Sequence, residues 1–410
     1  MCWGRCIRDS NVSPAEQRLL RLLRLDWLAS PDVEDDPGPI ADWGVIVERA
    51  LHHGVAPLLC RRLIRRPPPD APSDVIAAAA VYLESVEKQG AARLAQLIEV
   101  LAALERDGVE ALPFKGPVLG VAAHASATLR ESRDLDVLVR RQDMAAAVAS
   151  LRRLGYRPEE EFNRRITEAC YDSYGQEILF APGRLPVEPH WTFTPRGLAA
   201  EIDMEGIWSR ACPIELAGRQ VRSLSREDTL FVACLHGSKE KWWRLLWVAD
   251  VAAFLCRHPA IDWTTVASRA ESHGLRRMWL LGLALARELF GAEIPPSLTS
   301  SIDRDAACGD LLRASLHNLF AASVDVGSVH WISRYHLRAR ERYSDRVRYV
   351  LRSLATPQAE HYRMISLPPA LTPAYSAVKI LHDYAAKPLW IAFRRIAGRN
   401  GDSEVPGSSA

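Results

Sequence analysis

The chain of 410 residues is longer than one typical hydrophobic core supports, so we expect two or three domains. With 48% apolar and 25% charged residues, its composition is that of a globular protein and excludes a largely disordered chain. The net charge of +2 comes from 52 basic and 50 acidic residues, so no overall field attracts nucleic acid or a membrane surface, and any anionic ligand must be held by local charges.

The N-terminal part of the chain carries the spacing of amphipathic helices. Leucines recur at helical intervals after Ser13-Pro14, a pair that is typical of a helix start. The acidic, proline-rich segment 31–39 and the three prolines at 67–69 interrupt this spacing and predict loops. We predict helices over residues 13–28, 42–64 and 74–107. Residues 1–107 are therefore expected to form an N-terminal helical region.

From residue 108 the pattern becomes that of a small α/β unit, which we expect to span residues 108–201. Short apolar, β-branched runs predict strands, and glycine or proline separates them from the helical segments. We predict strands over 109–114 and 133–139, helices over 117–126 and 142–155, and a β-hairpin made of 171–180 and 185–191.

Helical spacing returns over residues 202–396, which we expect to form a C-terminal helical region. Ser225 has the sequence context of a capping box at a helix start. A further helix is predicted from Lys239 to Leu255. Residues 397–410 are polar and rich in glycine and serine, which is typical of a disordered tail.

Asp134 and Asp136 are the most informative residues of the chain. They stand two apart in an apolar, β-branched run, and side chains at i and i+2 of a strand project from the same face, about 7 Å apart at the backbone. Two carboxylates held side by side repel each other unless a cation lies between them. Mg²⁺ prefers oxygen ligands of this kind. The pattern therefore indicates a magnesium site, and Mg²⁺ is the cofactor that we expect.

A two-metal site for phosphoryl or nucleotidyl transfer also needs a third carboxylate and groups that hold phosphates. Glu188 stands between apolar residues on a predicted neighbouring strand, so it is the expected third ligand. Gly116 lies between a predicted strand and a predicted helix, which would let backbone N–H groups and the helix N-terminus face an anion. The cationic side chains expected to neutralise a triphosphate are Lys115, Arg130 and Arg133.

Each of these features alone has an ordinary explanation. A lone Asp-x-Asp is more often a solvated strand edge or turn, and a lone Lys-Gly before a helix is a weaker signal still. The order of the elements is what favours a metal site: glycine turn, helix, Asp-x-Asp strand, helix, and hairpin with a carboxylate.

Several motifs together resemble one protein family. They are Phe-Lys-Gly at 114–116, Leu-Arg-x-Ser-x-Asp-Leu-Asp-Val-Leu-Val at 129–139, Leu-Gly-Tyr at 154–156 and Val-Glu-Pro-His-Trp at 187–191. Helical segments on both sides continue the likeness, so that it covers roughly residues 13–295. The chain resembles the uncharacterised bacterial nucleotidyltransferase family of the polymerase-beta-like superfamily.

The resemblance implies an α+β fold, with a small mixed β-sheet nucleotidyltransferase core flanked by N-terminal and C-terminal helical regions. It implies that Asp134, Asp136 and Glu188 bind two magnesium ions and that Gly116 marks the nucleotide-binding turn. The expected activity is Mg²⁺-dependent transfer of a nucleoside monophosphate from an NTP, such as ATP, to a hydroxyl of an acceptor, with release of pyrophosphate. The acceptor could be a small molecule, a sugar, a peptide or a protein.

Two departures from the superfamily's pattern leave an alternative open. The turn is usually Gly-Gly or Gly-Ser, whereas Pro117 follows Gly116 here and removes one backbone donor and one hydroxyl. Pro189 follows Glu188 and predicts that this strand lies at a sheet edge or ends there. The alternative is a catalytically reduced protein of this fold that binds nucleotides or acts as a regulatory module.

Three further residues are possible accessories to the site. His190 is close enough to Glu188 in sequence to contact a phosphate or orient the carboxylate, and packing at the hairpin end is an equal alternative. Asp250 needs a partner, because the helix that carries it is apolar nearly all round. His236 is the expected partner, with internal hydrogen bonding favoured over a role in positioning the acceptor.

The remaining patterns concern partners and location. Arginines and tyrosines mix over residues 334–352, a composition that could bind RNA but more often marks the solvated face of a helix, so we expect no nucleic-acid partner. The longest clean apolar runs are far too short for a membrane span. Eight scattered cysteines without zinc spacing, and a start without the apolar region of a signal peptide, predict reduced thiols and a cytoplasmic protein.

Overall fold

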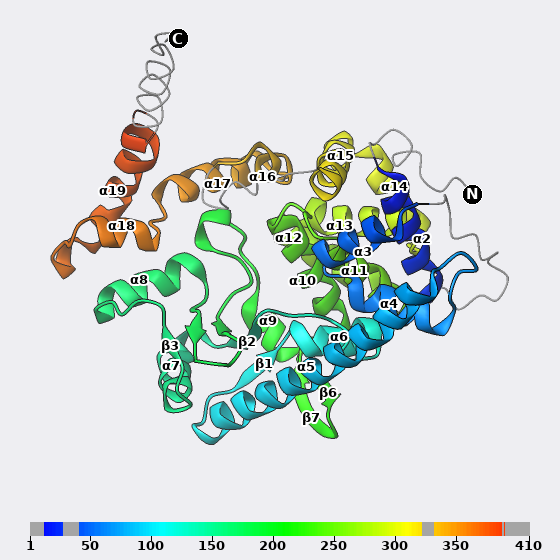
Figure 1. Cartoon of the computed structure of the whole chain (residues 1–410). Coiled ribbons are helices and arrows are strands. Elements are labelled where there is room, and N and C mark those ends of the chain that lie inside the picture. Colours follow the sequence, from blue (N-terminus) through cyan, green and yellow to red (C-terminus); the bar gives the residue numbers. More distant parts are fainter. Residues whose placement is uncertain (1–11, 28–40, 322–331, 388, 390–410) are drawn as a thin grey trace, which may run out of the picture.

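The computed structural model describes residues 12–27, 41–321, 332–387 and 389 (Figure 1). Within them, helices surround a five-stranded mixed sheet with the strand order β1-β2-β5-β4-β3, and two more strands form a separate hairpin. This is the α+β fold with a small mixed sheet that the sequence predicts. The predicted disordered tail, 397–410, lies outside the described residues.

The main sheet is built around one parallel pair of strands. Its members are β1 (Ala111–Pro113), β2 (Leu135–Val139), β3 (Arg157–Pro158), β4 (Leu179–Phe180) and β5 (Val187–His190). β2 pairs antiparallel with β1 and parallel with β5, and the β5–β4 and β4–β3 pairs are antiparallel. In the parallel pair, Asp136 stands opposite Glu188 and Leu138 opposite His190.

Four helices form the N-terminal part of the described chain. They are α2 (Pro14–Trp27), α3 (Trp43–His52), α4 (Ala56–Arg65) and α5 (Ser73–Arg106). The single helix predicted over 42–64 is thus two helices, because Gly54 takes a left-handed conformation with φ of 72° just after α3 ends. Asp42 caps α3, since its carboxylate accepts a hydrogen bond from the Gly44 N–H over 2.7 Å.

Short helices connect the strands of the sheet. They are α6 (Gly116–His124), the 3₁₀ turn η1 (Arg141–Asp143), α7 (Met144–Arg153), α8 (Arg164–Tyr174) and η2 (Arg196–Leu198). The prediction of a strand over 171–180 is wrong for most of that range, because α8 continues to Tyr174. Asn163 caps α8 through its side chain, and Ile166, Cys170 and Tyr174 recur at the spacing of one helical face.

The C-terminal part is mostly helical, with one β-hairpin that the sequence reading missed. The elements are α9 (Met204–Ser209), β6 (Cys212–Leu216), β7 (Arg219–Ser223), α10 (Arg226–Lys239), α11 (Leu245–Arg257), α12 (Trp263–Ser272), α13 (Arg276–Phe290), α14 (Pro296–Arg304), α15 (Ala306–Phe320), α16 (Arg334–Arg338), α17 (Tyr343–Ala355), α18 (Ala359–Met364), η3 (Pro369–Ala374), α19 (Tyr375–Leu381) and the π-helical turn η4 (His382–Ala386). The helix predicted from Lys239 to Leu255 is wrong at its start. Lys241 and Trp242 both have positive φ values, so the chain turns between α10 and α11.

Two large apolar cores hold the sheet in place. The first joins α2, α3 and α4 to the C-terminal helices from α10 to α15, and it also includes residues of β1 and α6. The second lies between the sheet and helices α5 and α7, and it contains Leu135, Val137 and Val139 of β2. Because strand side chains alternate, Asp136 and Leu138 face the opposite way, toward the first core. Among the described helices, none combines the length and apolarity needed to cross a bilayer.

Candidate active site

The parallel pairing of β2 with β5 places two carboxylates side by side. Asp136 stands opposite Glu188 in the register, and His190 projects from the same face as Glu188 because it lies two residues further along β5. The potential ligand atoms of these three side chains all lie within 4.8 Å of one another. The sheet thus assembles a cluster from segments more than fifty residues apart.

Asp136 is the centre of the cluster and is only 3% exposed. Its Oδ1 atom accepts a hydrogen bond from Lys115 Nζ over 2.7 Å and lies 2.9 Å from His190 Nε2. Its Oδ2 atom is buried without a hydrogen-bond partner. Since an unpaired buried carboxylate oxygen is costly, this atom is poised to bind a cation.

Glu188 is held from the β4 side of β5, whereas Lys115 contacts Asp136 from the β1 side. Gln176 donates a hydrogen bond from Nε2 to Glu188 Oε2 over 2.8 Å, and His190 Nε2 lies 3.4 Å from the same oxygen. Gln176 comes from the connection between α8 and β4, so this connection orients the carboxylate.

Charges within the cluster set the protonation of its members. Burial alone would raise the pKa of Asp136, but Lys115 and His190 hold that pKa well below its ordinary value. Burial alone would lower the pKa values of Lys115 and His190, yet the carboxylates raise both above their ordinary values. Lys115 and His190 thus both favour the anionic form of Asp136.

Asp134 lies just before β2 rather than in it, and its carboxylate is not part of the three-residue cluster. Burial raises its pKa to about 6, and the negative charges of Asp136 and Glu188 add to that effect. The structure thus brings Asp136 and Glu188 together directly, with His190, and leaves Asp134 near enough to be influenced by both.

The turn after β1 has the backbone that an anion site needs. Gly116 has a φ of 52°, in the left-handed region that glycine tolerates best. A side chain there would lie 3.4 Å from Ser132 Oγ, and that hydroxyl is buried without a hydrogen-bond partner. Pro117 is one of the first residues of α6, where a helix makes no use of the missing N–H.

Of the two predictions made from Pro189, the sheet edge is wrong, whereas β5 does end one residue later, at His190. β5 pairs with β2 on one side and β4 on the other. The Pro189 carbonyl accepts a hydrogen bond from the Glu177 N–H, toward β4. The backbone nitrogen and carbonyl of a strand residue point to the same side, so the Pro189 nitrogen also points toward β4. Because β4 has only two residues, the N–H that Pro189 lacks interrupts no long series of hydrogen bonds.

Arg130 is buried and paired behind the cluster. Only 7% exposed, it donates from Nε to Asp250 Oδ2 over 3.0 Å, while His124 Nε2 lies 2.9 Å from Asp250 Oδ1. The predicted pairing of His236 with Asp250 is therefore wrong, since Asp250 bonds to His124 and Arg130. The predicted phosphate-binding residue Arg133, in contrast, is exposed.

His236 instead faces the back of Lys115. It packs edge-on against Trp247, with 5.1 Å between ring centroids, and lines a cavity of about 20 Å³ together with Lys115, Arg130 and Asp250. A cavity of that size holds about one water molecule. Burial lowers the pKa of His236 well below its ordinary value, and the nearby Lys115 charge adds to this, so its ring is neutral. The C-terminal helices α10 and α11 thus support the site from behind.

The donor set fits a hard divalent cation. Carboxylate oxygens from adjacent strands are the ligands that Mg²⁺ prefers, and the unpartnered Oδ2 of Asp136 is available to one. Sequence reasoning did not find Gln176, His124 or Ser132, because each acts through a contact that only the fold creates.

Comparison with known proteins identifies the family. The model of the family described as uncharacterised nucleotidyltransferase matches residues 39–291. Among solved structures, the chain is similar to the solution structure of the antibiotic-resistance factor ANT(2'')-Ia, with 16% sequence identity and a TM-score of 0.30, over 43% of this chain and 89% of that one. No curated protein matches the chain. Since the family match covers more than half of the sequence, this chain belongs to the family of uncharacterised nucleotidyltransferases.

Proposed function

We propose that this protein is an Mg²⁺-dependent nucleotidyltransferase that transfers a nucleoside monophosphate from an NTP to an acceptor hydroxyl and releases pyrophosphate. The observation that carries the proposal is the pairing of Asp136 with Glu188 on parallel strands, next to Lys115. Asp136 and Glu188, together with Asp134, would hold the metal. When bound, Mg²⁺ polarises the phosphate oxygens and lowers the pKa of the attacking hydroxyl.

The NTP would bind on the β1 side of the two carboxylates. Lys115 and the N-terminus of α6 direct positive charge at this place, and Gly116 lets the backbone approach a phosphate. The Ser132 hydroxyl, buried beside Gly116 without a partner, supplies a hydrogen-bond donor where Pro117 supplies none. Arg133 is exposed and free to approach the outer phosphates.

The proposed chemical step uses these positions. The acceptor oxygen forms a bond to the α-phosphorus, and the bond between the α-phosphorus and its bridging oxygen to the β-phosphorus breaks. The electron pair of that bond leaves with pyrophosphate, and the hydroxyl proton passes to Glu188. Gln176 and His190 keep the Glu188 carboxylate oriented for this transfer.

The Asp136→Asn variant tests the proposal, because it keeps the shape of the side chain and removes its charge. We expect the affinity for Mg²⁺-NTP, measured by calorimetry, to fall about 100-fold or more, equivalent to about 3 kcal/mol. Asp172→Asn, at an exposed aspartate of α8, is the matched control. Circular dichroism checks that both variants fold. Unchanged Mg²⁺-NTP affinity in Asp136→Asn would sink the proposal.

The regulatory alternative makes a different prediction in the same assay. A catalytically reduced protein binds Mg²⁺-NTP but releases no pyrophosphate with any acceptor. Pro117, which removes a donor from the turn, is the observation that favours it. Calorimetry paired with a pyrophosphate assay separates the two functions.

A further inference from the structure

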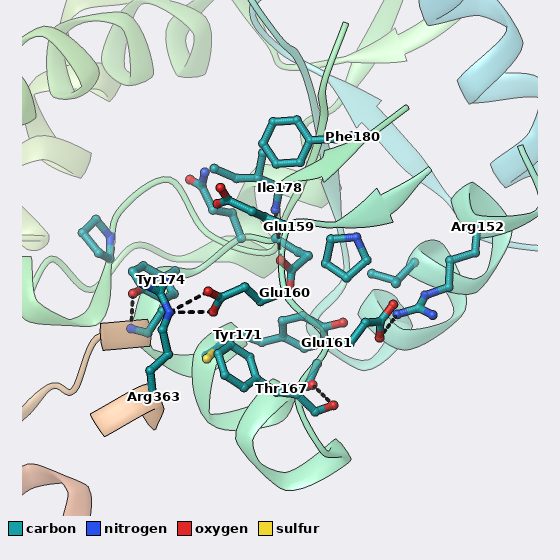
Figure 2. Close-up of a pocket in the computed structure, with 18 of the residues that line it drawn as sticks. Arg152, Glu159, Glu160, Glu161, Thr167, Tyr171, Tyr174, Ile178, Phe180 and Arg363 are labelled. Carbon is teal, nitrogen blue, oxygen red and sulfur yellow. Dashed lines mark hydrogen bonds and ion pairs between the residues drawn. The ribbon is translucent and has the colours of Figure 1, made fainter. Parts of the chain in front are cut away.

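A large cavity lies next to the carboxylate cluster, on the side away from Lys115. Its volume is about 370 Å³, which is within the range of sites for small molecules. Its walls come from the segment after β3, from α8, from the residues around β4, from the end of α10 and from α18 (Figure 2). The cavity therefore brings together residues near the sheet and two helices of the C-terminal part, α10 and α18.

Gln176 connects this cavity to the proposed catalytic carboxylates. It lines the cavity and donates its side-chain amide to Glu188 over 2.8 Å. Lys115 contacts Asp136 from the opposite direction, across β2 from β5. A phosphate donor on the β1 side and a second molecule on the β4 side would thus meet at Asp136 and Glu188.

Carboxylates outnumber cationic groups in the cavity wall. The acidic residues are Glu159, Glu160, Glu161, Glu177 and Glu240, and the basic ones are Arg152, Lys239 and Arg363. Each basic residue has an acidic partner within the wall: Arg152 pairs with Glu161, Arg363 with Glu160, and Lys239 with Glu240. The first two of these pairs are drawn as dashed lines in Figure 2.

Glu159 and Glu177 remain as carboxylates without an ion pair in the described part of the chain. Glu177 is half-buried, and burial raises its pKa to about 7. A carboxylate in such a poorly solvated place gains most from a cation that enters with a ligand. An anionic ligand would be repelled by the same groups.

Aromatic rings complete the wall. Tyr171 and Tyr174 come from α8, Phe162 precedes that helix and Phe180 ends β4. Figure 2 shows Tyr171, Tyr174 and Phe180 around the same space as the glutamates. Aromatic faces attract organic cations and cover their apolar parts.

We propose that this cavity binds the acceptor, and that the acceptor is an organic cation, such as an amine or guanidinium compound, that carries a hydroxyl group. The inference rests on the proposed nucleotidyl transfer and names its substrate class. In the reaction the acceptor hydroxyl oxygen bonds to the α-phosphorus, pyrophosphate departs with the electrons of the broken P–O bond, and the proton passes to Glu188. The product is a nucleoside monophosphate ester of the cation.

The test uses the full chain, MgCl₂ and α-³²P-labelled NTPs. A low-molecular-weight extract of bacterial cells is sorted at neutral pH by ion exchange into cationic, neutral and anionic fractions, and transfer of label to each fraction is measured. We expect labelled product from the cationic fraction. Label that appears only with the neutral or anionic fraction would overturn the inference and leave the proposed transferase intact. Failure to transfer label with every fraction would refute the proposed function, and the inference with it.

A double variant and a control variant test whether the acceptor binds in this cavity. We expect the Glu159→Gln/Glu177→Gln double variant to raise the acceptor KM at least tenfold while the KM for NTP stays the same. Glu168→Gln is the matched control, since Glu168 belongs to α8, which forms part of the cavity wall, but does not line the cavity itself and pairs with Arg141. An acceptor KM equal to that of the wild type in the double variant would show that the acceptor binds elsewhere.

Discussion

Glu177 makes the stability of this protein depend on pH, and its replacement by glutamine removes that dependence. Burial raises the pKa of Glu177 from 4.5 to about 7. The hydrogen bond from the Ile178 N–H and the nearby Arg152 charge lower this pKa, but by less than burial raises it. In the unfolded chain the carboxyl titrates near its ordinary value. Between these two values the folded state binds more protons than the unfolded state. The free energy of unfolding therefore falls as the pH rises from 4.5 to about 7.

The size of the effect follows from the same two values. One pKa unit corresponds to about 1.4 kcal/mol. Raising the pKa of Glu177 from 4.5 to about 7 therefore lowers the free energy of unfolding by about 3 kcal/mol at a pH where the group is ionised in both the folded and the unfolded state. At pH 5 Glu177 keeps its proton in the folded state, so most of this loss in the free energy of unfolding is absent. We expect the stability of Glu177→Gln, relative to the wild type, to be about 2 kcal/mol greater at pH 8 than at pH 5.

Urea-induced unfolding at the two pH values measures this difference. Glu168→Gln, at a partly exposed glutamate of the preceding helix α8 that pairs with Arg141, is expected to show no comparable pH dependence. If the effect of Glu177→Gln on the free energy of unfolding is the same at pH 5 and pH 8, the carboxyl is not perturbed by burial. Glu177 would then not be poorly solvated, and the reason for it to gain most from a bound cation would fail.

Two packing predictions concern the support behind the site. Asp250→Ala leaves the buried Arg130 guanidinium without the carboxylate that it bonds, so we expect a loss of about 3–5 kcal/mol in urea-induced unfolding; a loss below about 1 kcal/mol would contradict this pairing. Gly237→Ala places a methyl group 2.3–2.5 Å from the Trp242 ring, so we expect about 1–3 kcal/mol of destabilisation by the same measurement, and wild-type stability would show that the ring moves freely.

The sequence predicted the parts of the site that depend on local pattern. Asp136 lies in an apolar, β-branched run and Glu188 in a short segment that alternates, so both strands could be placed before their pairing was known. Their parallel register depends on the whole sheet, and so does the inclusion of His190 in the cluster. The α+β fold class follows from the order of such segments and agrees with the structure.

The errors occurred where one pattern fits two structures. The alternation of residues 171–180 predicts a strand, but α8 extends through Tyr174, since Asn163 offers a helix cap and apolar residues recur every four positions from Ile166. The β6–β7 hairpin was missed although Ala217-Gly218 forms a turn with two positive φ values between alternating residues. The partner of Asp250 could not be found, because His124 reaches it from a distant helix.

If the cavity binds the acceptor as proposed, selection of the acceptor would depend on a part of the chain beyond the family match. That match ends at residue 291, whereas α18 forms one wall of the cavity. Arg363 of α18 pairs with Glu160 over 2.7 Å, so Arg363→Ala adds one uncompensated carboxylate to the wall. A unit charge about 8 Å from a bound cation contributes about 0.5–1 kcal/mol at an effective dielectric constant of about 40–80, or roughly a two- to fivefold change in affinity.

The acceptor KM should therefore fall in Arg363→Ala and rise in Glu177→Gln, with the KM for NTP unchanged in both variants. Steady-state kinetics with the cationic fraction as acceptor measures both changes. Damage to the cavity wall would raise the acceptor KM in either variant, because lost packing does not depend on the sign of the charge removed. Changes of opposite sign in the acceptor KM of the two variants would therefore show that the carboxylates attract the acceptor, because altered cavity shape would raise the KM in both. An acceptor KM that rises in Arg363→Ala would refute the charge argument.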